Sequence, residues 1–346
     1  MDGHEYSQLA SKIPCFLTNM HGFLSIHDLP QQQLRFTRQR ERQWRLAAAA
    51  CRTCTRLTWP PRYATQRTRT ATLMATFDVP TRSFPVPEKT RTYLRRQPLI
   101  VCIRLKSFIL DQYAGARDAL EAQRKRLLTL AAGHGVELTD QESQTAAMII
   151  QIVETLQNAG LHNFEITMDM PGVEWALRYL HETRGTSILL GAGTVLHASQ
   201  LERAIACGCR FTMSPVFLPG RSEQLIAYAR EHNVLFIPGA ATPSECVQAS
   251  LALGEYQPVK VFPADVVGGL RFIRALAGPL SHIPLIPTSG VTFDVVEDYL
   301  SADNVYAVGV SQQILPTSRL LAGDWPQIHR LACVWRKAVE SAAPSP

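Results

Sequence analysis

Short apolar runs alternate with longer amphipathic stretches from Pro98 to near the C-terminus. The runs have the length of buried strands, and the stretches between them repeat their apolar residues at helical spacing. The expected strands cover residues 98–104, 162–168, 187–193, 211–215, 234–240, 258–264, 283–290 and 305–311. The helices expected after them cover 145–160, 171–185, 197–207, 221–232, 243–253, 268–277, 292–300 and 324–340.

Eight strands, each followed by a helix, predict an α/β fold with a parallel sheet that is buried on both faces. Eight such units in roughly 250 residues is the number found in a closed (β/α)8 TIM barrel, which is the fold we predict. An open, doubly wound sheet is the alternative. Such a sheet normally carries a glycine-rich dinucleotide turn after its first strand, and no such turn follows residue 104.

Residues 107–143 interrupt the alternation between the first strand and its helix. The segment DQYAGARDALEAQRKRLLTLAAGHG within it predicts an additional helix that ends at a glycine-rich stop. An insertion after a barrel strand falls at the carboxyl end of the barrel, where active sites lie. A lid, an oligomer contact and an inert decoration all stay open.

The N-terminal part of the chain has a different character. Residues 1–97 contain 16 Lys and Arg against 6 Asp and Glu, whereas the remaining residues contain 19 basic and 23 acidic side chains. We predict a disordered or targeting extension over 1–96, a barrel over 97–341 and a short tail over 342–346. A basic arm that binds polyanions and a start of translation at Met74 stay open.

The eight cysteines are scattered, and several lie in apolar strands or helices, which favours a reducing compartment over a disulfide framework. We therefore expect a cytoplasmic protein, or an organellar one if the arginine-rich segment is a transit peptide. No apolar run reaches the length of a membrane-spanning helix, and we expect neither a membrane nor a nucleic-acid partner. We interpret the pair Cys51 and Cys54 as chance, because zinc needs about four ligands and no second pair follows.

Three expected strands carry charged residues at positions that face the barrel interior. Alternate side chains of a barrel strand point inward, which predicts that Lys260 and Phe262 face inward in VKVFP. The same rule turns Glu165 inward in NFEITM, and Cys102 and Arg104 inward in LIVCIR. Burial of these charges costs several kcal/mol unless they pair or are used in a reaction. A buried ion network without a reaction stays open.

A lysine, a glutamate and an arginine in one interior are the parts of a lysine-type aldolase. Apolar surroundings favour the neutral form of an amine, and a neutral amine attacks a ketone to form a Schiff base. Glu165 can then move protons directly or through a water molecule. Arg104 can hold a substrate carboxylate through two parallel hydrogen bonds. The combination indicates a 2-keto acid as the substrate.

Small residues close the last two expected strands, as TSG (288–290) and GVS (309–311). Backbone N–H groups exposed there, with the N-terminus of a following helix, would bind a phosphate, as barrels often do at this position. Ordinary tight turns are the other interpretation. Asp265 follows the expected strand 258–264 and could cap the helix at 268–277 or tune the site, and we favour the cap.

Eight stretches, in this order, resemble one enzyme family: PLIVCIR, FEITMDMPG, GAGTVL, MSPVF, IPGAATPSE, VKVFPAD, IPTSGV and AVGVS. The family is that of the 2-keto-3-deoxy-6-phosphogluconate (KDPG) aldolases, with the related 4-hydroxy-2-oxoglutarate (KHG) and 6-phosphogalactonate aldolases. The resemblance covers roughly residues 97–340 without the insertion. It implies a homotrimeric barrel that needs no metal and no cofactor, and that cleaves a small 2-keto acid to pyruvate and an aldehyde such as glyceraldehyde 3-phosphate.

The resemblance also implies roles for individual residues. Lys260 would be the Schiff-base lysine and Glu165 the proton-transfer residue. Thr194 would contact the substrate. The wall near the lysine would be Pro215 and Phe262, and the phosphate would be bound at Ser289, Gly290 and Ser311.

Two positions depart from the family pattern. Many members carry an arginine four residues after the glutamate, where this chain has Asp169. Arg104 resembles the variant in which the first strand supplies the cation. A Gly-Gly pair is usual where this chain has Ser289-Gly290. An unphosphorylated substrate such as 4-hydroxy-2-oxoglutarate and a catalytically silent barrel that serves as a phosphate-binding scaffold therefore stay open.

Overall fold

The computed structural model of the protein describes residues 88–115, 117–254 and 257–342. Most of the extension expected at 1–96, and the expected tail from residue 343, lie outside the described residues. Residues 88–96 differ from the expectation of disorder, because they form helix α3 (Glu88–Arg96). Leu94 of this helix is fully buried. Because the sequence of this segment is mostly polar, Leu94 alone did not produce the repeat of apolar residues that predicts a helix.

The strands match the expected ones in order but are shorter. They are β1 (Leu99–Ile103), β2 (Asn163–Thr167), β3 (Leu189–Gly193), β4 (Phe211–Met213), β5 (Leu235–Ile237), β6 (Gly239–Ala240), β7 (Val259–Val261), β8 (Leu285–Pro287) and β9 (Val308–Val310). The expected strand 234–240 is divided into β5 and β6 by Pro238. Proline lacks the N–H that a continuous ladder needs.

All described strand pairs are parallel. The order of hydrogen-bonded neighbours is β5-β4-β3-β2-β1-β9 in one sheet and β6-β7-β8 in the other. Two isolated parallel bridges, Leu285 to Val305 and Thr288 to Gly309, link β8 to the β9 segment. The expected α/β fold with a parallel, curled sheet is confirmed.

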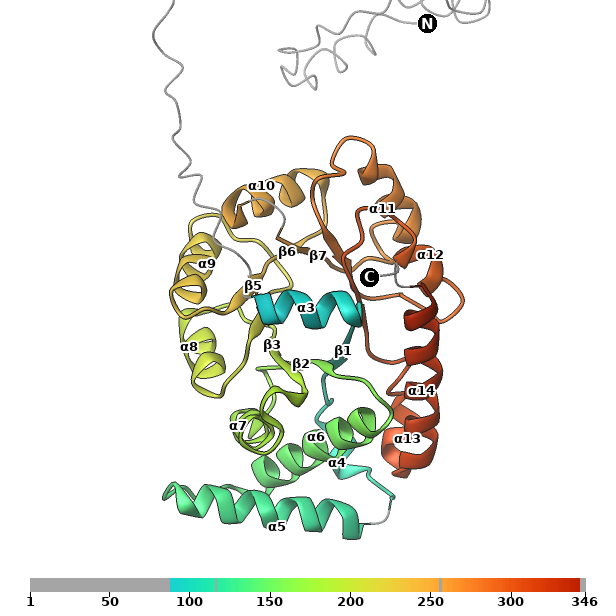
Figure 1. Cartoon of the computed structure of the whole chain (residues 1–346). Coiled ribbons are helices and arrows are strands. Elements are labelled where there is room, and N and C mark those ends of the chain that lie inside the picture. The colour runs from blue at the N-terminus through green and yellow to red at the C-terminus, as the bar shows by residue number, and fades with distance from the viewer. Residues whose placement is uncertain (1–87, 116, 255–256, 343–346) are drawn as a thin grey trace, which may run out of the picture. The chain divides into compact units, whose positions relative to one another are not determined.

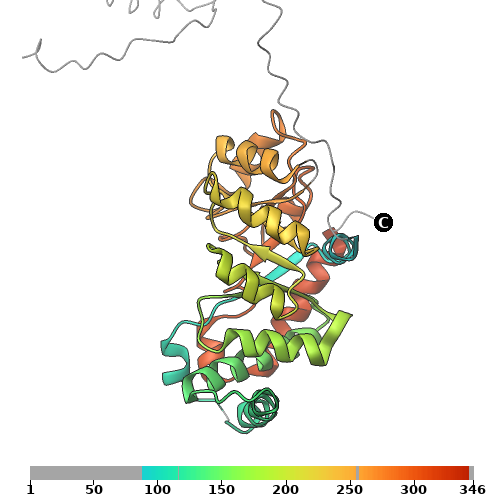
Figure 2. The same cartoon turned by 90° about the vertical axis from the view of Figure 1, so that its left-hand side faces the viewer.

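Helices surround the strands in Figure 1, and Figure 2 shows the same arrangement from the side. Besides α3, they are α4 (Phe108–Asp111), α5 (Arg117–Gly133), α6 (Asp140–Asn158), α7 (Val173–Arg184), α8 (Ala198–Ala206), α9 (Arg221–Glu231), α10 (Pro243–Leu253), α11 (Gly269–Ala277), α12 (Val296–Leu300), α13 (Thr317–Ala322) and α14 (Trp325–Ala342). Among these described helices, none combines the length and apolar character needed to cross a membrane.

Local sequence signals explain where several helices begin. Helix α10 begins with a capping box, in which the side chain of Thr242 accepts a hydrogen bond from the Glu245 amide and the Glu245 side chain accepts one from Thr242. Pro243 occupies the first helical turn, where its missing N–H costs nothing. Helix α6 begins with the same arrangement of Thr139 and Glu142. Such caps satisfy backbone N–H groups that the helix itself leaves unpaired.

Two groups of apolar side chains form the core. The larger one lies between the strands and the helices, and includes Val259 and Val261. The smaller one contains residues from the alternate positions of the strands, among them Ile100 and Phe211, together with Leu94 of α3. The strands therefore bury both faces, as a parallel sheet requires.

The insertion expected at 107–143 forms α4 and α5 and the beginning of α6. Helix α5 contacts α6 and α7, and both views show it on the outer side of these helices. Leu127 of α5 is fully buried against them. The helix thus forms a second layer outside the ring of helices.

Candidate active site

Lys260 and Glu165 meet inside the fold. Lys260 is the middle residue of β7 and Glu165 the middle residue of β2. The Lys260 Nζ atom donates hydrogen bonds to Glu165 Oε1 at 3.0 Å and Oε2 at 3.4 Å. The two residues are only 5% and 1% exposed, respectively. The expected inward orientation of both side chains is therefore what the structure has, and it brings an amine and a carboxylate together away from bulk water.

Gly193 at the end of β3 provides the space for the Glu165 side chain. The two residues lie on neighbouring strands, where Glu165 pairs with Gly191 and Thr167 with Gly193. A Cβ atom added at Gly193 would lie 2.4 Å from Glu165 Oε1 and 2.8 Å from its Cγ. Contacts this short do not occur between real atoms, so any side chain at this position would displace the carboxylate.

Cys102 of β1 is the third inward residue near the pair. It pairs with Glu165 across the β1–β2 ladder and is partly buried. Burial raises the pKa of the Cys102 thiol far above its usual range, and the negative charge of Glu165 adds to this effect. The thiol consequently stays protonated beside the pair.

Arg104 lies directly after β1 and makes two contacts at the carboxyl ends of the strands. Its Nη2 atom donates a hydrogen bond to the Thr194 hydroxyl. Its Nε atom lies 3.6 Å from Asp169 Oδ2. The Arg104 and Asp169 side chains are 49% and 46% exposed, so they are accessible to solvent, unlike the pair formed by Lys260 and Glu165.

Phe262 and Pro215 follow the ends of β7 and β4, and both are partly buried. The Lys260 Nζ atom lies 5.5 Å from the centre of the Phe262 ring. The backbone of Pro215 lies against Gly239, where an added Cβ would be 2.2 Å from the Pro215 carbonyl carbon. The Phe262 ring thus lies beside the amine.

Ser289 and Gly290 follow β8, and Ser311 follows β9. The bridge between Thr288 and Gly309 holds these two strand ends side by side. Ser289 and Gly290 have φ angles of 81° and 70°. Such angles suit glycine but strain serine, which explains why glycine would be the natural residue at position 289.

The prediction that Asp265 caps the following helix is wrong. The N-cap of α11 is Gly268, and no side chain forms a capping hydrogen bond there. Asp265 instead lies over Gly290, where an added Cβ would be 2.1 Å from the Asp265 Cβ.

The helix expected at 292–300 begins only at Val296. Its N-terminus therefore does not follow the turn at Ser289 directly.

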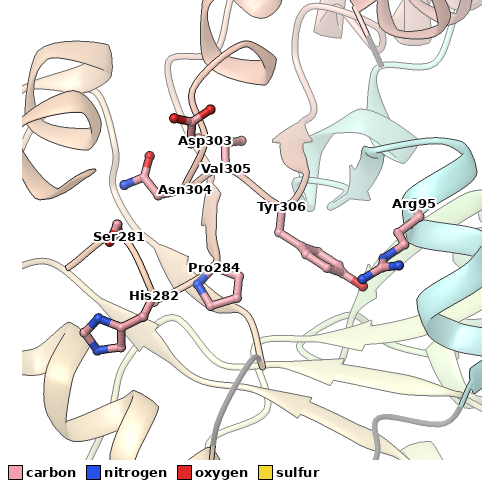
Figure 3. A pocket seen from close by; sticks show the side chains of 8 residues that line it. All are labelled: Arg95, Ser281, His282, Pro284, Asp303, Asn304, Val305 and Tyr306. Carbon is pink, nitrogen blue, oxygen red and sulfur yellow. The ribbon is translucent and has the colours of Figure 1, made fainter. Parts of the chain in front are cut away.

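A pocket of about 290 Å³ opens at the other end of these strands. Figure 3 shows its lining residues, which are Arg95, Ser281, His282, Pro284, Asp303, Asn304, Val305 and Tyr306. Pro284 immediately precedes β8, so the pocket lies at the amino ends of the strands. Lys260 and Glu165 do not line it, and active sites of barrel folds lie at the opposite end.

A metal site requires several ligating side chains close together. Among the residues that the structure describes, no three His, Cys, Asp or Glu side chains come close enough together to hold a metal ion.

The model of the aldolase family described as "KDPG and KHG aldolase" matches residues 139–331. The chain belongs to this family. The 2-dehydro-3-deoxy-phosphogluconate aldolase of Pseudomonas aeruginosa is 34% identical over 197 residues, which cover 57% of this chain and 84% of that protein. The KHG/KDPG aldolase of Escherichia coli is 34% identical over 194 residues, which cover 56% of this chain and 85% of that enzyme.

A solved structure of the family has the same fold. It is the KDPG aldolase of Legionella pneumophila, with pyruvate captured at low pH as a covalent carbinolamine intermediate. Its similarity to this chain has a TM-score of 0.53 and 26% identity, and covers 70% of this chain and 96% of that one. The expected membership in the KDPG/KHG aldolase family is thus confirmed.

Sequence reasoning missed two features of this aldolase site. It did not assign a role to Gly193, although a glycine within a strand, here its last residue, often marks a close approach of another group. It also treated Asp169 only as the loss of an arginine. The contact between Asp169 and Arg104 joins a loop to a neighbouring strand, and the spacing of residues within single strands does not contain that information.

Proposed function

We propose that the protein is a Schiff-base aldolase that cleaves a 2-keto-3-deoxy sugar acid, phosphorylated at C6, into pyruvate and an aldehyde such as glyceraldehyde 3-phosphate. The observation that carries the proposal is the buried contact of 3.0 Å between Lys260 Nζ and Glu165 Oε1. Membership in the KDPG and KHG aldolase family supports it.

The first step forms a covalent bond between enzyme and substrate. The neutral amine of Lys260 attacks the C2 ketone, and the carbonyl oxygen takes up a proton to give a carbinolamine. Protonation of its hydroxyl then releases water and leaves an iminium ion at C2. Glu165 is the group that holds and returns these protons, because its carboxylate lies within hydrogen-bonding distance of the amine.

The second step breaks the bond between C3 and C4. Glu165, directly or through a water molecule, accepts the proton of the C4 hydroxyl, and the aldehyde leaves. The electron pair of the broken bond moves into the iminium and gives an enamine. Protonation of the enamine at C3 and addition of water at C2 release pyruvate and regenerate the Lys260 amine.

The remaining residues would bind the ends of the substrate. Arg104 carries several N–H donors near the mouth of the site, which suits the C1 carboxylate. Thr194 and Pro215 would contact the substrate between its ends, beside Phe262. The backbone at Ser289, Gly290 and Ser311 would bind the C6 phosphate.

The closure of the barrel and the oligomeric state are part of the same proposal. The order of paired strands, the bridges between β8 and β9, and the direct succession of β5 and β6 support a closed (β/α)8 barrel. We further propose a homotrimer of such barrels, preceded by the extension over 1–96, in the cytoplasm or in an organelle.

A second candidate is a 4-hydroxy-2-oxoglutarate aldolase, which would give pyruvate and glyoxylate by the same steps. Two observations favour it. Asp265 lies against Gly290, which adds a negative charge near the proposed phosphate position. Ser289 occupies a strained backbone position where glycine would allow a closer approach of phosphate.

Pyruvate formation from the two substrates tests the proposal and chooses between them. The measurement couples pyruvate release to NADH oxidation by added lactate dehydrogenase, with Lys260→Ala and Lys260→Met as controls whose folding is checked by circular dichroism. The proposal requires turnover by the wild type with one of the two substrates and none by the folded variants. A wild type that releases pyruvate from neither substrate would indicate the silent barrel instead.

A further inference from the structure

Asp169 lies where the chain turns after β2, and its carboxylate faces the guanidinium of Arg104. The Arg104 Nε atom is 3.6 Å from Asp169 Oδ2. On its other side, the Arg104 Nη2 atom donates a hydrogen bond to the Thr194 hydroxyl. Arg104, Asp169 and Thr194 follow β1, β2 and β3 closely, and these strands are neighbours in the sheet. The cation is therefore held from two sides.

Thr194 is itself fixed in an uncommon conformation. Its φ angle is 58°, a value that β-branched residues rarely adopt. Strain of this kind persists only where the surroundings hold the residue in place, and it occurs often at functional sites. The backbone of Thr194, whose hydroxyl accepts the Arg104 hydrogen bond, is thus held in one conformation.

Two of the three guanidinium nitrogens are engaged by these contacts. A guanidinium has five N–H donors in a rigid plane, so donors on Nη1 and Nη2 remain for a substrate. A long arginine side chain that is about half exposed would otherwise sample many rotamers, and binding would have to order it at a cost in free energy. The Asp169 carboxylate beside Nε removes part of that freedom.

We propose that Asp169 is a positioning residue that orients Arg104 for the carboxylate of the 2-keto acid. This inference rests on the proposed function. It gives a role to the residue that replaces the arginine of other members, and it makes the contact between Arg104 and Asp169 a determinant of substrate carboxylate recognition. Asp169 acts only through Arg104 and does not touch the substrate.

The test is a double-mutant cycle with Asp169→Asn, Arg104→Ala and the combination of both. The dissociation constant for pyruvate is measured by calorimetry, and KM and kcat are measured with the substrate that the wild type turns over. We expect Asp169→Asn to raise the pyruvate Kd and KM roughly two- to fivefold with little change in kcat, since the half-exposed ion pair that orders Arg104 is lost. In the Arg104→Ala background the same change should have no effect.

Asp298→Asn is the matched control, because Asp298 forms a similarly exposed ion pair with Arg274 at 2.9 Å on the outer helices. It should leave Kd, KM and kcat unchanged. Unchanged binding in Asp169→Asn would overturn the inference, as would an effect of equal size without Arg104. If the wild type binds pyruvate but turns over neither substrate, the proposed function is contradicted. The inference about Asp169 is still tested in that case, because the variants of the cycle are then compared by their pyruvate Kd.

Discussion

The Lys260 Nζ atom lies 3.0 Å from Glu165 Oε1, at a place where both side chains are almost fully buried. The strand alternation turns both residues away from the surrounding helices, and Gly193 leaves the space that the carboxylate occupies. An isolated buried charge is costly, so each group compensates the other. The same contact places a proton acceptor next to a nucleophile, which links the stability of the interior to the proposed chemistry.

Glu165→Gln keeps the shape of the side chain and removes the proton acceptor. We expect kcat to fall by roughly 10²- to 10⁴-fold, the usual contribution of a general acid–base group. Lys260 remains present, so pyruvate should still form a covalent adduct, but more slowly. Single-turnover kinetics measure both effects. A variant with the kcat of the wild type would exclude Glu165 as the proton-transfer residue.

Gly193→Ala is expected to reduce activity through the position of Glu165. The added Cβ would lie 2.4 Å from Glu165 Oε1, so the carboxylate must move away from Lys260. Overpacking of this kind typically costs about 1–3 kcal/mol of the free energy of unfolding. Chemical denaturation and steady-state kinetics measure the two effects.

Gly133→Ala at the end of α5 is the matched control for this change. Apart from its own helix backbone and its chain neighbours, no atom lies within 4 Å of a Cβ added there. Its kcat should equal that of the wild type, and its stability should not fall, because alanine at a helical position stabilises by about 0.4–1 kcal/mol. A Gly193→Ala variant with full activity would show that Glu165 tolerates displacement, or that its position does not matter.

The buried thiols are expected to resist alkylation. Burial raises the pKa of Cys207 and of Cys246 to about 11, with smaller contributions from the nearby Glu174 and Glu245 carboxylates respectively. The thiolate is the reactive form, so at pH 8 iodoacetamide should label both on the order of 100-fold more slowly than a free thiol. Labelling should accelerate as the pH rises towards 11.

Peptide mapping by mass spectrometry follows the labelling of each cysteine. Protein unfolded in guanidinium chloride is the control, because there all thiols regain ordinary pKa values and react quickly. Rapid labelling of Cys207 and Cys246 in the folded protein at pH 8 would contradict the burial of these side chains.

Strand alternation predicted the central pair from the sequence, because Lys260 and Glu165 are single charges inside apolar strands. The period of two fixes which face a residue occupies, and parallel strands bring those faces together. The same reasoning could not place Asp169, whose contact with Arg104 depends on the path of a loop. It also expected Asp265 to cap α11, whereas the chain begins that helix with Gly268.

Differences in the elements have equally local causes. Pro238 divides one expected strand into β5 and β6, because the ladder loses an N–H donor there. Helix α3 was missed because Leu94 is the one fully buried apolar residue among those of the helix whose burial the structure describes, and the segment is largely polar. Burial against the ends of the strands, which only the fold supplies, stabilises this helix.

Borohydride reduction in the presence of pyruvate shows whether Lys260 forms the Schiff base. The reagent converts a Schiff base into a stable secondary amine, so the adduct survives digestion and can be located by tandem mass spectrometry. We expect one pyruvyl-derived adduct on Lys260 in the wild type and none in Lys260→Ala. An unmodified Lys260 peptide after reduction, or an adduct on a different lysine, would contradict this expectation.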